Sequence, residues 1–176
     1  MLKPIKNKIS NYLARRKYLK EDIGSVKFND FFNNSDSFLI LMPNEENEFR
    51  FGLKVAEFLA ELEKQITILT PVKFSGKIPQ NKNTKIIHFA FEDVTKFNLP
   101  SDFLANKLNR KKFDVVMDLE RFENLFYSSL THMTQSKFKI GFQKEKLNEF
   151  YNILIDNKNE RPEFCYDDMI ESLKMF

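Results

Sequence analysis

Apolar residues along this chain follow two alternating patterns. Short continuous runs rich in β-branched residues, such as Ser37–Met42 and Phe113–Leu119, have the length and composition of strands that are buried on both faces. Stretches with apolar residues three or four positions apart lie between them, and these predict helices with one buried face. The other predicted strands cover 66–69, 85–90, 138–142 and 151–155, and the predicted helices cover 4–20, 45–64, 101–108, 122–133 and 167–173.

Strands that alternate with helices require crossover connections, which are right-handed and give a doubly wound sheet. We therefore expect a Rossmann-like α/β fold with five or six mostly parallel strands. Residues 37–176 would form a single domain, after an arm at 1–36 that carries an N-terminal helix and is anchored by Phe28, Phe31 and Phe32. Ligands of such folds bind beyond the carboxyl ends of the strands, where the strand order reverses. The segments predicted at that edge are Pro43–Glu48, Thr70–Lys73, Phe91–Asp93 and Asp118–Glu123.

Charge is distributed unevenly along the chain. The first twenty residues carry seven basic residues and no acidic one, whereas the rest carries 21 basic and 25 acidic residues. This segment predicts a basic amphipathic helix over 4–20, whose apolar face contains Ile5, Ile9 and Leu13. Such a helix either binds an acidic protein, RNA or an anionic membrane surface, or docks on its own domain. The candidate partner-binding residues are Lys3, Lys6, Lys8, Arg15, Arg16, Lys17 and Lys20.

Several classes of site lack their sequence signature. Cys165 is the only cysteine, so no intramolecular disulfide forms, and neither His88 nor His132 has a second ligand at metal-binding spacing. Glycine-rich phosphate-binding motifs are missing, so we expect no nucleotide cofactor and no metal. No apolar run reaches the roughly 18 residues of a membrane span, and no signal peptide is recognisable. We expect a cytoplasmic protein, with a position peripheral to the inner membrane as the alternative.

Three apolar strands resemble the N-terminal half of the heptosyltransferase-type glycosyltransferases of lipopolysaccharide synthesis. Phe38-Leu-Ile-Leu41 is similar to the first strand of that family, and Phe113-Asp-Val-Val-Met-Asp-Leu119 and Lys139-Ile-Gly-Phe142 are similar to its later pair. The chain also resembles short single-domain bacterial proteins of unknown function that share this half. The resemblance implies a Rossmann-like domain of the glycosyltransferase type.

Two departures from that family weaken a catalytic interpretation. The family's Gly-Asp turn, which holds its catalytic aspartate, aligns with Asn47-Glu48, and the sugar-nucleotide-binding second domain has no counterpart in this sequence. Glu48 is therefore a candidate general base, but we favour the alternative in which Glu45, Glu46 and Glu48 stabilise the first turn of a helix, where negative charge is favourable. Asp118 ends an apolar strand and is either a functional group or the cap of the next helix.

We expect a non-catalytic binding or assembly protein that contacts a protein partner. The alternatives are a subunit of an envelope glycosyltransferase whose donor site lies on another chain, and association with RNA or ribosomes through the basic arm.

Overall fold

The computed structural model of the protein describes residues 2–19 and 31–175, with side chains described from residue 6 onward. Within these residues, a single parallel sheet of six strands has the order β3-β2-β1-β4-β5-β6. The strands are β1 (Ser37–Leu41), β2 (Gln65–Pro71), β3 (Thr84–Phe89), β4 (Lys112–Asp118), β5 (Gln135–Phe142) and β6 (Ile153–Ile155). The helices are α1 (Leu2–Tyr18), α2 (Glu46–Glu61), α3 (Asp102–Asn109), α4 (Leu125–Met133) and α5 (Pro162–Lys174), with single helical turns η1 (Val72–Phe74), η2 (Phe91–Asp93) and η3 (Asn148–Phe150).

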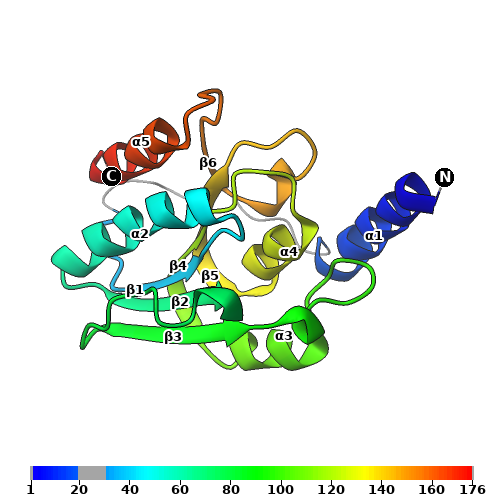
Figure 1. Cartoon of the computed structure of the whole chain (residues 1–176), viewed down its shortest axis with the longest axis horizontal. Coiled ribbons are helices and arrows are strands. Elements are labelled where there is room, and N and C mark those ends of the chain that lie inside the picture. Colours follow the sequence, from blue (N-terminus) through cyan, green and yellow to red (C-terminus); the bar gives the residue numbers. More distant parts are fainter. Residues whose placement is uncertain (1, 20–30, 176) are drawn as a thin grey trace.

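The predicted doubly wound Rossmann-like fold is confirmed. Helices α2 and α5 cover one face of the sheet, and α3 and α4 cover the other (Figure 1). Because side chains alternate along a strand, Ile40 of β1 packs into the first layer and Leu39 into the second. The strand order reverses between β1 and β4, which are hydrogen-bonded neighbours in the middle of the sheet. A ligand site is therefore expected at their carboxyl ends.

Several predicted helix boundaries were wrong. Asn44 has the residue type of a helix cap but does not cap α2, because the residue before the helix is Glu45, which makes no side-chain capping bond. Asn44 instead donates its backbone N–H to the Glu120 carboxylate. Phe122, the first residue of the helix predicted over 122–133, is exposed because α4 begins only at Leu125. Helix α5 begins at Pro162, five residues before its predicted start, because proline is well accommodated in the first turn of a helix.

Helix α1 docks on the body of the domain through part of the predicted face and through small residues beside it. Leu13 packs against the buried cluster of Ala14, Leu99, Leu147, Phe150 and Tyr151, as predicted. The small residues Ser10 and Ala14 are buried, and they let α1 approach α4 closely. Ile9, expected at this contact, is 44% exposed, and the side chain of Ile5 lies outside the described residues. Phe31 and Phe32 of the connecting arm are buried as predicted, whereas Phe28 lies outside the described residues. The N-terminal end of α1 points away from the body (Figure 1).

Membrane insertion finds no support in the described helices, since none of them combines the length and apolar character needed to cross a bilayer.

Candidate functional site

A pocket of about 500 Å³ opens at the carboxyl edge of the sheet, beyond β1, β2 and β3 and beside the start of α4. Each of the four segments predicted at this edge contributes to its lining. Asn44 follows β1, Val72 and Lys73 follow β2, Phe91 follows β3, and Glu123 follows β4. The sequence therefore predicted the position of the pocket, because the fold class alone fixes which loops meet there.

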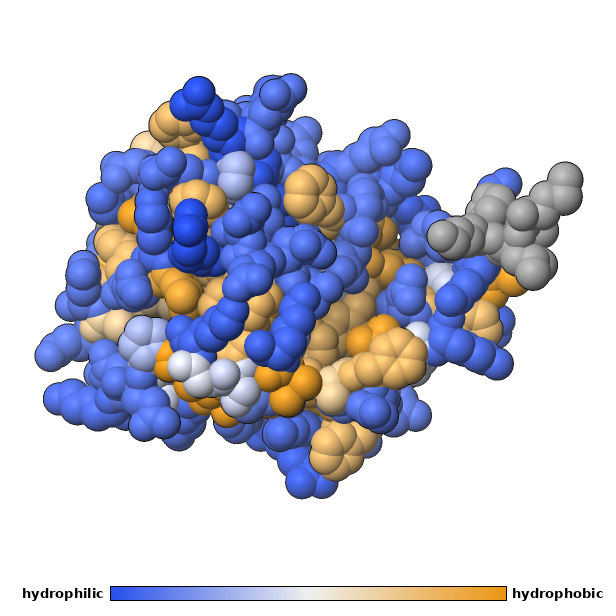
Figure 2. All heavy atoms as spheres, viewed as in Figure 1, coloured by the Kyte–Doolittle hydropathy of each residue, from blue (hydrophilic) through white to orange (hydrophobic). Residues whose placement is uncertain are grey.

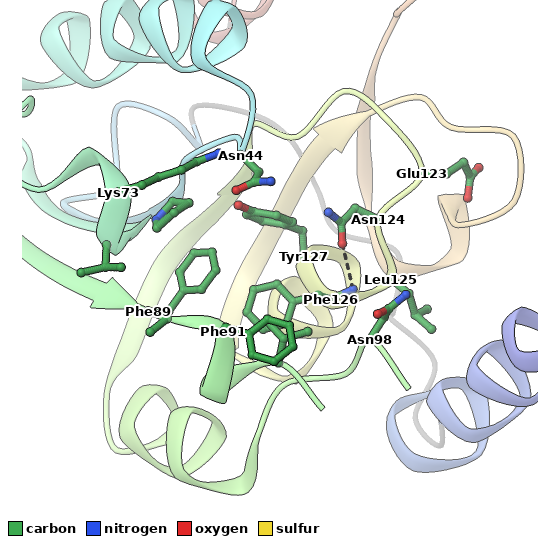
Figure 3. A pocket seen from close by; sticks show the side chains of 14 residues that line it. Asn44, Lys73, Phe89, Phe91, Asn98, Glu123, Asn124, Leu125, Phe126 and Tyr127 are labelled. Carbon is green, nitrogen blue, oxygen red and sulfur yellow. Dashed lines mark hydrogen bonds between the residues drawn. The ribbon is translucent and has the colours of Figure 1, made fainter. Parts of the chain in front are cut away.

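Aromatic rings form one part of the pocket wall. Phe89 and Phe126 are buried, with ring centroids 5.0 Å apart, and Phe91 stands beside them on η2 (Figure 3). Phe91 is 87% exposed, more than any other large apolar side chain among the described residues. The same face of the molecule shows apolar side chains gathered around α3 and the end of β3, with polar side chains around them (Figure 2).

Polar groups gather at the other end of the pocket. The hydroxyl of Tyr127 points toward Asn44, and the side chain of Lys73 extends toward the same residue (Figure 3). Tyr127 is 2% exposed, and its hydroxyl has no hydrogen-bond partner among the described residues. Burial and the nearby carboxylates of Glu120 and Asp118 raise the pKa of Tyr127 well above its ordinary value, so the phenol stays protonated and is a hydrogen-bond donor.

Asp118 lies behind this pocket in a buried network. Its Oδ2 atom accepts hydrogen bonds from Lys144 Nζ at 2.8 Å and from the Tyr151 hydroxyl at 2.5 Å, and its Oδ1 atom accepts the backbone N–H of Glu120. Ser128 Oγ lies 2.6 Å from the Tyr151 hydroxyl. The side chains of Asp118 and Lys144 are both 0% exposed. The alternative in which Asp118 caps the next helix is wrong, because Asn124 caps α4 by accepting the backbone N–H of Phe126 at 3.2 Å.

Glu48, the other catalytic candidate, is also held in a buried ion pair. It lies in the first turn of α2, and its Oε1 atom accepts a hydrogen bond from Arg121 Nη1 at 3.1 Å. Arg121 also donates to Asn157 Oδ1 at 2.8 Å and to the Asn159 carbonyl at 2.7 Å. This arginine thus connects α2 to the loop after β4 and the loop after β6. Asn47-Glu48 is part of a helix, so it does not form the turn that the alignment to the glycosyltransferases implied.

Glu120 lies between these two networks. Its carboxylate accepts the backbone N–H groups of Asn44 and Phe122 at 3.4 and 3.3 Å. Burial, followed by the charge of Asp118, raises the pKa of Glu120 to about 7. Because Asn44 lines the pocket, the protonation state of Glu120 affects the hydrogen bonding of one of the pocket residues.

Gly141 of the Lys139-Ile-Gly-Phe142 run has a packing role. A Cβ atom at this position would lie 2.5 Å from the ring of Tyr151. The hydroxyl of that ring is held by Asp118 and Lys144, so the ring has little room to move away. Glycine is therefore required for the buried network to form behind the pocket.

The basic residues of the arm divide into two groups. Arg15 and Lys17 pair with the body, through Glu149 at 2.7 Å and Asp102 at 3.2 Å. The candidates Lys6, Lys8 and Arg16 are exposed, and none of them forms an ion pair within the described residues. The side chain of Lys3 and the whole of Lys20 lie outside the described residues.

Four residues of the site were missed by sequence reasoning: Arg121, Tyr127, Lys144 and Tyr151. Tyr127 lies within an apolar helical stripe and therefore reads as a core residue. Lys144 follows a strand in a polar stretch, where lysine is normally exposed. Metal binding finds no support, since the described residues contain no cluster of three or more acidic, histidine or cysteine side chains suited to an ion.

A family model of unknown function, DUF6913, matches residues 6–176. The chain belongs to this family. The match includes most of α1 and the whole sheet, so the pocket and both buried ion pairs lie within the family's domain. No curated protein and no solved structure matches the chain. The resemblance to heptosyltransferases therefore stays a hypothesis.

Proposed function

We propose that this member of the DUF6913 family is a non-catalytic binding protein whose ligand site is the pocket at the carboxyl edge of the sheet. One observation carries the proposal: the hydroxyl of Tyr127 is buried at the pocket without a hydrogen-bond partner among the described residues. A buried polar group without a partner costs about 1–3 kcal/mol of stability. A ligand that accepts a hydrogen bond from this hydroxyl removes that cost.

The positions of the candidate catalytic side chains favour a protein that binds its ligand without converting it. Asp118 and Glu48 are buried and paired with Lys144 and Arg121, and neither lines the pocket, so neither reaches a substrate bound there. Tyr127 holds its proton because of its raised pKa, and it therefore positions a ligand rather than acting as a base. The same ion pairs argue against the alternative in which this chain is the subunit that supplies Glu48 as base to a glycosyltransferase.

Binding at the pocket is tested by a fragment screen followed by NMR on isotope-labelled protein. We expect at least one fragment to shift the amide signals of Val72, Ala90 and Leu125, which line the pocket. Val72 is exposed, so Val72→Trp should fill the pocket without unfolding the protein and should abolish these shifts. Leu62→Trp places the same ring on an exposed position outside the pocket and is the matched control.

Two outcomes would refute the proposal. If every fragment binds elsewhere, or binds the Val72→Trp variant as well as it binds the control, the pocket is not the ligand site. If the purified chain chemically converts a molecule that it binds there, the protein is an enzyme.

A second role, contact with an acidic protein partner, rests on the side of α1 that faces solvent. Lys6, Lys8 and Arg16 are exposed on this helix and form no ion pair with any described residue, and Ile9 and Tyr12 are exposed among them, Tyr12 by 62%. Arginine and tyrosine are enriched in protein interfaces, and this mixture of apolar and basic side chains favours a protein over RNA or lipid. We therefore propose that the protein partner contacts the exposed side of α1.

Charge reversal tests this second role. Replacing Lys6, Lys8 and Arg16 by Glu should release proteins that copurify with the native chain. Raised salt should release them too, because exposed charges are screened within about 8 Å already at physiological ionic strength. The matched control reverses three exposed lysines on the body, Lys82, Lys107 and Lys111. Copurified RNA in place of protein, or binding that is indifferent to salt and to the reversal, would overturn the assignment.

A further inference from the structure

We propose that the ligand of this pocket is a neutral nucleoside: a planar heteroaromatic base joined to an uncharged polar group. This inference rests on the proposed function and adds the chemical class of the ligand. Three independent features of the pocket select that class, namely its aromatic wall, its unpaired amide and hydroxyl groups, and the charges around it.

The aromatic wall favours a flat ring. Phe89 and Phe126 form a buried base to this wall, and Phe91 presents its ring to solvent at 87% exposure. A flat aromatic ligand that stacks on Phe91 removes this surface from water and gains the specific attraction between stacked rings. Stacking on an exposed aromatic side chain is a common way of holding a nucleobase, since every base has a π face.

The polar groups favour a ring whose edge carries both donors and acceptors. The side-chain amides of Asn44 and Asn98 line the pocket and make no hydrogen bonds within the described part of the chain. An amide offers a donor and an acceptor side by side, which matches the edge of a heterocyclic base. The hydroxyl of Tyr127 adds a donor at the inner end, beside Asn44 (Figure 3).

The charges disfavour a phosphate. Asp118 and Glu120 lie close enough to Tyr127 to raise its pKa, and Glu46 interacts with Lys73, the lysine that lines the pocket. A phosphate would bring at least one further negative charge to a pocket whose described lining holds one basic side chain, Lys73, and the carboxylate of Glu123. The volume of about 500 Å³ is ordinary for a small-molecule site and leaves room for a base together with its sugar.

Titration calorimetry with adenosine, guanosine, cytidine and uridine, and with the corresponding 5′-monophosphates, tests the inference. We expect at least one nucleoside to bind, and to bind more tightly than its own monophosphate. Phe91→Ala should weaken binding by at least about tenfold because it removes the stacking ring. Tyr127→Phe should weaken it by about tenfold because it removes one donor and nothing else. Phe103→Ala removes a ring that is 73% exposed on α3 outside the pocket, and it should leave affinity unchanged.

The results separate this inference from the proposed function. If fragments bind the pocket but no nucleoside does, the ligand class is wrong and the binding site stands. If a monophosphate binds more tightly than its nucleoside, the argument from charge is wrong. If nucleosides bind Phe91→Ala and Phe103→Ala with equal affinity, they do not stack in this pocket, and the inference fails. If neither fragments nor nucleosides bind, both proposals fail.

Discussion

Replacing Glu120 by glutamine should stabilise the protein above neutral pH and remove a pH dependence of its stability. In the folded protein, burial and the charge of Asp118 raise the pKa of Glu120 to about 7 from an ordinary value of 4.5. Between these two values the unfolded chain has already released the proton, while the folded chain still holds it. The unfolded state then binds fewer protons, so the free energy of unfolding falls as the pH rises from about 4.5 to about 7.

The size of the effect follows from the same two values. One pKa unit corresponds to about 1.4 kcal/mol, so the difference between 4.5 and about 7 amounts to about 3 kcal/mol of stability that is lost by pH 8. In the wild type, the Glu120 carboxylate accepts the backbone N–H groups of Asn44 and Phe122. Glutamine cannot ionise, and its carbonyl oxygen can still accept one of these two hydrogen bonds. We therefore expect Glu120→Gln to be more stable than the wild type at pH 8 and close to it at pH 5.

Because the chain has no tryptophan to report unfolding by fluorescence, circular dichroism is used to follow its unfolding in urea. The measurement is repeated at intervals from pH 5 to pH 8. The control is Glu92→Gln, which removes an exposed carboxylate and should leave the wild-type pH profile unchanged. The reasoning is refuted if wild type and Glu120→Gln have parallel profiles across this range, since Glu120 would then titrate alike in the folded and unfolded states.

Three further changes test the buried polar groups. Lys144→Met should cost about 3–5 kcal/mol of unfolding free energy in a urea titration, because it leaves the Asp118 carboxylate buried without its cation. Gly141→Ala should cost about 1–3 kcal/mol in the same assay, because the new methyl group meets the ring of Tyr151. Tyr127→Phe should raise the melting temperature of the ligand-free protein, by an amount equivalent to about 1 kcal/mol, because it removes a buried hydroxyl that has no partner within the described residues.

Each of these changes has a control or a contrary outcome. Adding Asp118→Asn to Lys144→Met should recover part of the lost stability, and an unchanged loss would mean that the ion pair is not the cause. Gly141→Ala combined with Tyr151→Ala should be less harmful than the two single losses added together, and simple additivity would contradict the proposed clash. A Tyr127→Phe variant that is less stable than the wild type would mean that the hydroxyl has a partner after all.

The order and type of most elements could be read from the sequence because they depend on local pattern. Buried parallel strands need continuous apolar runs, and Phe38–Leu41 and Val115–Met117 show them clearly. Alternation with helices then implies the crossover topology, and the topology implies which loops meet at the ligand-binding edge. The exact ends of the helices were harder to predict. Asn44, for example, is a common cap residue by type, but its backbone N–H donates to Glu120 and its side chain does not cap α2.

The partners of the polar residues were decided only by the tertiary structure. Asp118 and Lys144 lie 26 positions apart, and Glu48 and Arg121 lie 73 apart, so no local pattern records that each pair is buried together. The docking face of α1 was likewise set by the packed chain, since Ser10 and Ala14 are buried whereas Ile9 is 44% exposed. The position of the pocket could be predicted from the sequence, because strand ends follow from pattern. Only the packed chain decided which side chains were left free to bind there, because a side chain's hydrogen bonds depend on neighbours that are distant along the chain.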